Sequence, residues 1–140
     1  MNRFVLDASV ATKWYVDEEH SAISLQFAAT EPAWIVPDLF FAEVGNVLWK
    51  KVQRGEIDDV DAIEAVTLLH RLEIKVYEAR SLIDSALKLA LHFQCTVYDG
   101  LYLSAAILED CPLVTADRKF FKIFSEDVLR KNILWIEDAV

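Results

Sequence analysis

The architecture of this chain follows from the stretch Arg3-Phe4-Val5-Leu6-Asp7-Ala8-Ser9, in which an apolar run ends at a carboxylate. Phe4-Val5-Leu6 has the short, continuously apolar character of a strand that is covered on both faces. Asp7 follows this run at once, and a carboxylate in such a setting is costly to bury unless something cationic meets it. We therefore interpret Asp7 as a candidate site residue at the end of a buried strand.

Three further acids lie in comparable apolar sequence, where a strand should end or a helix should begin. They are Glu43 in Phe40-Phe41-Ala42-Glu43-Val44, Asp99 in Val97-Tyr98-Asp99-Gly100-Leu101, and Asp117 in Leu113-Val114-Thr115-Ala116-Asp117. Carboxylates that share one site repel each other unless a cation lies between them. An all-oxygen set suits a hard divalent cation such as Mg²⁺ or Mn²⁺, and the dispersed histidines make a zinc site a poor interpretation. The pattern predicts a metal site shared by Asp7, Glu43, Asp99 and Asp117.

Short apolar runs alternate with helical patterns along the chain. We predict strands at 4–6, 34–36, 74–77, 113–114 and 133–135. We predict helices at 9–15, 21–29, 39–53, 58–72, 81–93, 98–108 and 118–124, with Asp38 as the cap of the third and Gly55 after its end. This alternation indicates an α/β fold, a parallel sheet with helices on both faces. Ligands of such sheets bind beyond the carboxyl ends of the strands, so the topology can gather the four acids at one edge.

Polar residues near the acids have two interpretations each. Ser9, Asn46 and Thr115 could hold a carboxylate or a metal-bound water. Ser9 could instead cap a helix, and Thr115 could make only a local turn bond. Asp99 could simply favour a helix N-terminus, and Asp117 could be an N-cap.

Composition sets the class of protein. The chain has 140 residues, of which 54% are hydrophobic, and we expect 1–140 to form a single domain with a sizeable core. Charged residues interrupt every apolar run before it reaches the length of a membrane span. Asp7 falls where the apolar part of a signal peptide should be, so we expect a cytoplasmic protein with no membrane association. Cys95 and Cys111 lack metal-ligand spacing and are interpreted as buried, reduced thiols.

The net charge of −9 disfavours a nucleic-acid partner, because such affinity normally comes from Lys and Arg neutralising phosphates. Bound divalent cations would place positive charge where a phosphate must sit. Two local basic clusters could also contribute, although both could equally be solvated helix faces. One is Lys50, Lys51 and Arg54, and the other is Arg118, Lys119 and Lys122.

In this order, the segments that contain the acids resemble the PIN-domain family, in particular the VapC-type toxins of prokaryotic toxin–antitoxin pairs. The resemblance covers nearly the whole chain and is carried by residues 5–11, 37–48, 96–106 and 113–120. It implies a single PIN-like domain over 1–140, a three-layer α/β/α fold around a five-stranded parallel sheet of order 3-2-1-4-5. It also implies that the family's four catalytic acids are Asp7, Glu43, Asp99 and Asp117, and that Thr115 is the hydroxyl before the last acid.

The same resemblance implies a function. PIN domains of this type are Mg²⁺- or Mn²⁺-dependent endoribonucleases with RNA as substrate, usually homodimeric, and inhibited by a VapB-like antitoxin. Apolar surface around Trp49 and Phe40-Phe41 would suit such contacts. We expect Asp7, Asp99 and Asp117 to be the chief metal ligands, with Glu43 helping to hold the metal or orienting the attacking water. Some relatives carry a further acid where this chain has basic residues after Asp117, so one-metal and two-metal chemistry both stay open.

Two alternatives compete with this interpretation. A PIN-fold module that no longer cuts could serve only to bind a partner, although the intact set of four acids argues against it. A haloacid dehalogenase or a receiver domain also places an Asp after its first strand. The dehalogenase pattern needs a second Asp at the position of Ser9, and a receiver needs its phospho-accepting Asp where this chain has Val76-Tyr77-Glu78.

Overall fold

The computed structural model describes residues 2–124 and 127–140, and its centre is one parallel sheet of five strands. The strands run in the order β3-β2-β1-β4-β5, and every pairing between neighbours is parallel. Their bounds are β1 Arg3–Leu6, β2 Ala33–Pro37, β3 Ile74–Tyr77, β4 Leu113–Thr115 and β5 Ile133–Trp135. The predicted fold class and strand order are therefore confirmed.

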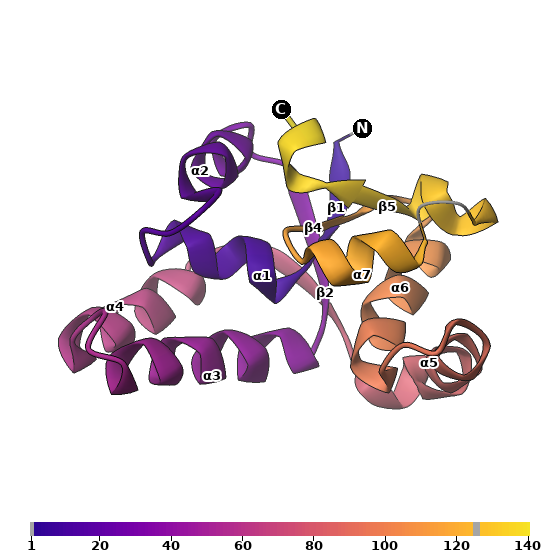
Figure 1. Ribbon diagram of the computed structural model, residues 1–140, viewed down its shortest axis with the longest axis horizontal. Helices are drawn as coiled ribbons and strands as arrows, with labels where there is room; N and C mark the ends of the chain where they lie inside the picture. The colour runs from indigo at the N-terminus through magenta and orange to yellow at the C-terminus, as the bar shows by residue number, and fades with distance from the viewer. Residues whose placement is uncertain (1, 125–126) are drawn as a thin grey trace.

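Helices cover both faces of this sheet. The chain moves from β1 to β2 to β3 in one direction and from β3 to β4 to β5 in the other, so right-handed connections place their helices on opposite faces. Figure 1 shows α3 and α4 on one side of the central strands and α5 and α6 on the other. The helices are α1 Ala8–Ala11, α2 Ser21–Ala29, α3 Leu39–Gln53, α4 Asp59–Leu69, α5 Ala79–Phe93, α6 Val97–Glu109 and α7 Arg118–Ile123. Short 3₁₀ turns lie at η1 Thr12–Trp14, η2 Val128–Asn132 and η3 Ile136–Asp138.

The neighbouring strands β1 and β4 lie at the point where the direction of the connections reverses. Val5, Leu6, Leu113 and Val114 are all fully buried there, because both faces of these strands are covered. In open α/β sheets the crevice beyond the carboxyl ends of two such strands is where ligands bind. We therefore expect a ligand site among the residues that follow Leu6 and Val114.

Gly100 brings α6 unusually close to α5. A Cβ atom at this position would lie 2.4 Å from the Ala86 carbonyl oxygen, so only glycine permits this approach. Thr96 caps α6 by accepting a hydrogen bond from the Asp99 N–H at 3.0 Å. These two contacts hold the first turn of α6, and with it Asp99, in place.

Some predicted helix ends differ from the structure. Asp38 has helical backbone angles, φ −62° and ψ −23°, and does not cap α3 with its side chain. Its Oδ1 instead accepts from the Ala79 N–H at 3.2 Å, where α5 starts two residues earlier than predicted. The predicted position of Gly55 after the end of α3 is confirmed, and its φ there is 72°. The position of Gly55 follows from local backbone geometry, whereas the bond of Asp38 depends on a partner 41 residues away.

The predicted helix at 9–15 is divided into α1 and η1. The Val10 carbonyl accepts a backbone N–H at the end of α1, where the chain tightens into the 3₁₀ turn, and it also accepts from the Ser24 hydroxyl at 2.9 Å. The helix predicted at 58–72 likewise stops at Leu69. Cys111 is buried as expected, whereas Cys95 is only half-buried, and both are free thiols. Among the helices in the described ranges, none is both long enough and apolar enough to cross a membrane.

Candidate active site

Asp7 lies at the carboxyl end of β1 and is 8% exposed. Its Oδ2 accepts hydrogen bonds from Ser9 Oγ and from Thr115 Oγ1, both at 2.7 Å. Burial raises the pKa of Asp7 above its usual 3.8, the two hydroxyl bonds oppose that rise, and the charge of Asp117 adds to it. Asp7 is thus a carboxylate held firmly in one orientation in a place where its charge is costly.

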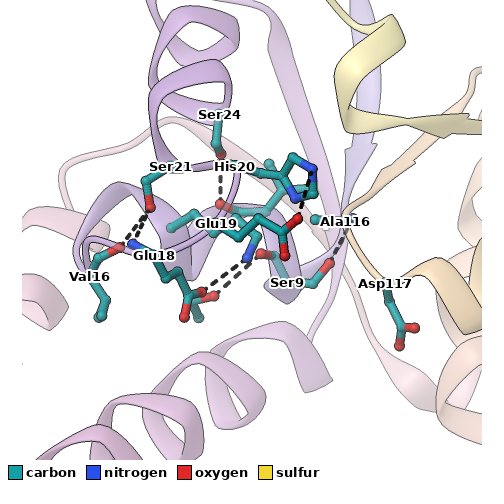
Figure 2. Close-up of polar contacts among 12 residues, drawn as sticks. Ser9, Val16, Glu18, Glu19, His20, Ser21, Ser24, Ala116 and Asp117 are labelled. Carbon is teal, nitrogen blue, oxygen red and sulfur yellow. Dashed lines mark hydrogen bonds and ion pairs between the residues drawn. The ribbon is translucent and has the colours of Figure 1, made fainter. Parts of the chain in front are cut away.

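The same hydroxyls connect the ends of β1 and β4. Ser9 Oγ accepts from the Ala116 N–H at 3.0 Å, and Thr115 Oγ1 accepts from the Asp117 N–H at 3.0 Å. Figure 2 shows the bond from Ala116 to Ser9, with the carboxylate of Asp117 projecting beyond it. Ser9 makes no capping bond in α1, so the capping alternative is wrong; Thr115 makes both the local turn bond and the bond to Asp7.

Asp117 begins α7 and is exposed. Its Oδ1 accepts from the Phe120 N–H at 3.2 Å, so it is an N-cap as well as a candidate site residue. The cap fixes the side chain at the edge of the sheet through Oδ1. Because a carboxylate has two oxygens with several lone pairs, the capping bond does not exhaust its capacity to bind a cation.

Asp99 lies in the first turn of α6 and is half-buried. Burial, followed by the charge of Asp7, raises the pKa of Asp99 from 3.8 to about 6, while Thr96 acts in the opposite direction. Asp117 adds a smaller increase. The helix N-terminus would by itself favour the charged form and lower the pKa. The pKa of Asp99 is raised instead, so the effects of burial and of the neighbouring acids are larger than that of the helix N-terminus.

Glu43 projects from α3 toward the same region. Burial raises its pKa, and the charges of Asp7 and Asp99 add to that effect. Its Oε1 is buried and has no hydrogen-bond partner within the described part of the chain. The Tyr102 hydroxyl is near enough to lower the pKa of Glu43. In this structure, however, it makes no hydrogen bond to Glu43, so the Oε1 atom has no partner.

One pocket of about 270 Å³ brings the candidate residues together. It is lined by all four acids and by Ser9 and Asn46, along with Ala8, Val47 and Lys50. Thr115 is fully buried behind Asp7. Within residues 2–124 and 127–140, however, no three Asp, Glu, His or Cys side chains stand close enough to form a ready-made metal cage. The four acids therefore line one pocket without forming a compact cluster.

The structure separates residues that the sequence analysis had grouped as basic clusters. Lys51 pairs with Glu18 at 2.8 Å and Glu56 at 2.9 Å, while its neighbour Lys50 lines the acid pocket. In the second cluster, the Arg118 guanidinium lies 4.1 Å from the centre of the Trp135 ring, and Lys119 lines an adjoining pocket. That pocket has a volume of about 440 Å³ and shares Asp99 and Asp117 with the first.

Tyr102 was not among the residues predicted for the site, and Lys50 was named only as part of a basic cluster. Tyr102 lies three residues after Asp99, and Lys50 lies seven after Glu43, so each shares a helix face with an acid. That spacing was a signal for both. Apolar neighbours made Tyr102 resemble an ordinary core residue, and it is indeed 1% exposed.

Comparison with known proteins agrees with this geometry. The family model described as PIN domain matches residues 4–124. Ribonuclease VapC3 of Pyrobaculum aerophilum is 31% identical over 124 residues, which cover 87% of this chain and 95% of that protein. Ribonuclease VapC1 of Mycobacterium tuberculosis is 30% identical over 120 residues, covering 85% and 89%.

Solved structures share the fold. The crystal structure of PAE2754 from Pyrobaculum aerophilum aligns with a TM-score of 0.69 at 25% identity, over 97% of this chain and 85% of that one. VapC20 of Mycobacterium tuberculosis, described as a sarcin-ricin loop cleaving toxin, aligns with a TM-score of 0.68 over 86% and 95%. Its identity of 11% supports the fold alone. Because the family model spans most of the chain and two VapC proteins align with it nearly end to end, the chain belongs to the PIN-domain family, in its VapC group.

Proposed function

We propose that this protein is a metal-dependent endoribonuclease, the toxin of a toxin–antitoxin pair, with Asp7, Glu43, Asp99 and Asp117 as its catalytic acids. The observation that carries the proposal is the single pocket that these four acids line beyond the ends of β1 and β4. The names of its relatives, Ribonuclease VapC3 and Ribonuclease VapC1, support RNA as the substrate. The cytoplasm, where RNA is abundant, is the proposed site of action, and cell fractionation would test it.

The residues in the pocket fit a hard divalent cation, Mg²⁺ or Mn²⁺. Every candidate donor is an oxygen, as these ions require. The unpaired, buried Oε1 of Glu43 and the raised pKa of Asp7, Glu43 and Asp99 all indicate a site that is short of positive charge. We assign Asp7, Asp99 and Asp117 as the chief ligands, with Glu43 as a further ligand or as the group that orients the attacking water. A divalent ion in such a site neutralises phosphate charge and makes water more acidic.

The remaining residues of the pocket have supporting roles in this proposal. Ser9 and Thr115 fix the orientation of Asp7 through two short hydroxyl bonds, which also favour its charged form. Asn46 lies one turn after Glu43 on α3 and can donate an amide hydrogen to a water or a phosphate oxygen. Together these groups would orient a water molecule for in-line attack on a phosphodiester.

The decisive experiment is cleavage of single-stranded RNA by the purified protein. We expect endonucleolytic products with Mg²⁺ or Mn²⁺, complete arrest by EDTA, and recovery when the ion is restored. Cleavage that survives EDTA would contradict a metal-dependent mechanism. If a pool of RNA sequences stays intact at millimolar Mn²⁺, the proposal fails and the non-cutting binding module becomes the better interpretation.

Lys50 and Lys119 offer a route for RNA across an acidic protein. Each is exposed and lines one of the two pockets that share Asp99 and Asp117, and neither has an ion pair with a carboxylate in the described structure. A phosphate on either side of the acids would therefore meet a free ammonium group. Local charge, and not the net charge of −9, would then determine where RNA binds.

Replacing Lys50 by Ala should weaken RNA binding and make it less sensitive to salt. Loss of one phosphate contact to a single strand lowers the slope of log K against log salt by about 0.7. Fluorescence anisotropy on a cleavage-inactive background would measure this slope. Lys51→Ala is the matched control, because that side chain is already paired with two glutamates and should leave the slope unchanged. Equal effects of the two variants would remove Lys50 from the proposed RNA path.

An antitoxin partner is proposed to occupy the apolar groove between α3 and α4. This pocket of about 270 Å³ is lined by Gly45, Leu48, Trp49, Val52, Asp59, Ala62, Ile63 and Val66. Trp49 and Ile63 are 58% and 69% exposed, whereas Phe40 is fully buried, so its predicted share in this surface is wrong. The groove suits the apolar face of a partner helix. Trp49→Ala should weaken binding of the VapB-like protein by roughly 2 kcal/mol in calorimetry, the size of an interface hot spot, and an unchanged affinity would exclude the groove.

A homodimer is also part of the proposal. Ile83, Leu87 and Leu91 follow one another at four-residue spacing along α5 and are 41%, 47% and 73% exposed. Such an aliphatic stripe is a suitable contact for a second copy. Light scattering at micromolar concentration should report a dimer that Leu87→Glu disrupts, and a monomeric wild type would contradict this.

A further inference from the structure

Buried polar atoms without partners lie on α3 and α6, the helices that carry Glu43 and Asp99. In the described part of the chain, three buried side-chain polar atoms lack a hydrogen bond: Glu43 Oε1, Tyr102 Oη and Ser104 Oγ. Leaving such atoms unpaired costs free energy, and native structures contain few of them. Tyr102 lies one turn after Asp99 on α6, Asp99 and Glu43 line one pocket, and Tyr102 and Glu43 shift each other's pKa. The shared location calls for a functional explanation.

Glu43 differs from the other buried acid in how it is held. Two hydroxyl bonds fix Asp7. Glu43 has a longer side chain with more rotatable bonds, and no hydrogen bond of the described residues orients it. A carboxylate that must bind a metal or orient water needs a partner that selects one rotamer.

The Tyr102 hydroxyl is suited to provide that partner. Tyr102 is a buried residue of α6 and is 1% exposed, so its hydroxyl has little freedom to move. A tyrosine hydroxyl is protonated at neutral pH and can donate one hydrogen. No described residue accepts that hydrogen, and no described residue donates one to Glu43 Oε1.

We propose that Tyr102 is a positioning residue of the nuclease site: its hydroxyl donates a hydrogen bond to the Glu43 carboxylate when the acids close on the divalent ion, and so selects the orientation of Glu43. The inference rests on the proposed metal-dependent function. It concerns a hydrogen bond only, and Tyr102 itself contacts neither the ion nor RNA. That bond would give both buried atoms a partner.

The test compares Tyr102→Phe with Ser104→Ala by calorimetric titration with Mn²⁺ alone. Tyr102→Phe keeps the ring and removes one oxygen, and we expect Mn²⁺ affinity to fall about 10- to 100-fold, as for other groups that orient metal ligands. Ser104→Ala removes the other unpaired hydroxyl, two residues along the same helix, and should bind Mn²⁺ like the wild type. RNA cleavage by Tyr102→Phe should show a lower kcat with an unchanged KM.

A double-mutant cycle shows whether Tyr102 acts through Glu43. On a Glu43→Ala background, Tyr102→Phe should cause no further loss of Mn²⁺ affinity. Wild-type affinity in Tyr102→Phe would overturn the inference, as would an additive loss in the double variant. An unfolded Tyr102→Phe would also overturn it, because the hydroxyl would then carry a structural bond. If the wild type binds no Mn²⁺ at all, the proposed function itself fails, which is a different result.

Discussion

Asp99→Asn should abolish metal-dependent RNA cleavage while leaving the fold intact. The change is isosteric and removes the charge of the acid whose pKa is raised to about 6, in the first turn of α6. We expect kcat to fall by at least about 100-fold, because loss of a metal ligand should cost more than the 10- to 100-fold loss seen when a group that only orients a ligand is removed. Single-turnover cleavage of a labelled RNA would measure the loss.

The matched control for this variant is Asp110→Asn. Asp110 ends the same helix, is exposed, and undergoes the same change of charge. Its activity should equal that of the wild type. Because Asp99→Asn also removes repulsion from Asp7, its melting temperature without metal should be equal to or above that of the wild type. Retained cleavage in Asp99→Asn, or a loss that simply follows unfolding, would contradict the assignment.

Stability without metal should fall as the pH rises, and a divalent ion should reverse this. Asp99 has a pKa of about 6 in the folded protein against an ordinary 3.8, so between these values the folded state binds more protons than the unfolded state. The stability associated with protonated Asp99 is therefore present at low pH and is lost as the pH rises through about 6. The raised pKa of Asp7 and Glu43 acts in the same direction.

A bound ion competes with those protons. At an Mn²⁺ concentration of 100 times Kd, stabilisation is about 2.7 kcal/mol, which for a domain of this size raises the melting temperature by roughly 5–10 °C. We expect that gain at pH 7.5 and expect it to disappear as the pH falls below about 6. Differential scanning fluorimetry from pH 5 to pH 7.5 measures the pH dependence of the melting temperature without Mn²⁺ and the pH dependence of the gain that Mn²⁺ gives. An Mn²⁺ effect of equal size at pH 5 would contradict a site made of these carboxylates. Asp99→Asn should make both the melting temperature and the gain from Mn²⁺ depend less on pH.

The sequence was a good guide wherever local pattern determines the result. Apolar runs placed all five strands, and the four acids that interrupt apolar sequence do line one pocket. Family resemblance contributed the strand order, which local pattern alone does not contain. Thr115 and Ser9 were recognisable because they lie within two residues of an acid.

Features that depend on distant partners were missed or wrong. Asp38 looks like a helix cap in sequence, but its side chain bonds to Ala79, 41 residues away. Lys50 and Lys51 look equivalent until Glu18 and Glu56 pair with only one of them. These outcomes follow from which surfaces meet in the folded protein, and no window of local sequence reports that.

Crystals grown with Mn²⁺ offer the plainest view of whether the acids share an ion, because the manganese anomalous signal locates the metal without reference to the protein. We expect a peak in the pocket beyond the ends of β1 and β4, within coordination distance of Asp7, Asp99 and Asp117, with Glu43 rotated toward it. A pocket free of anomalous density at saturating Mn²⁺, with its carboxylates still apart, would contradict the proposed site and the nuclease built on it.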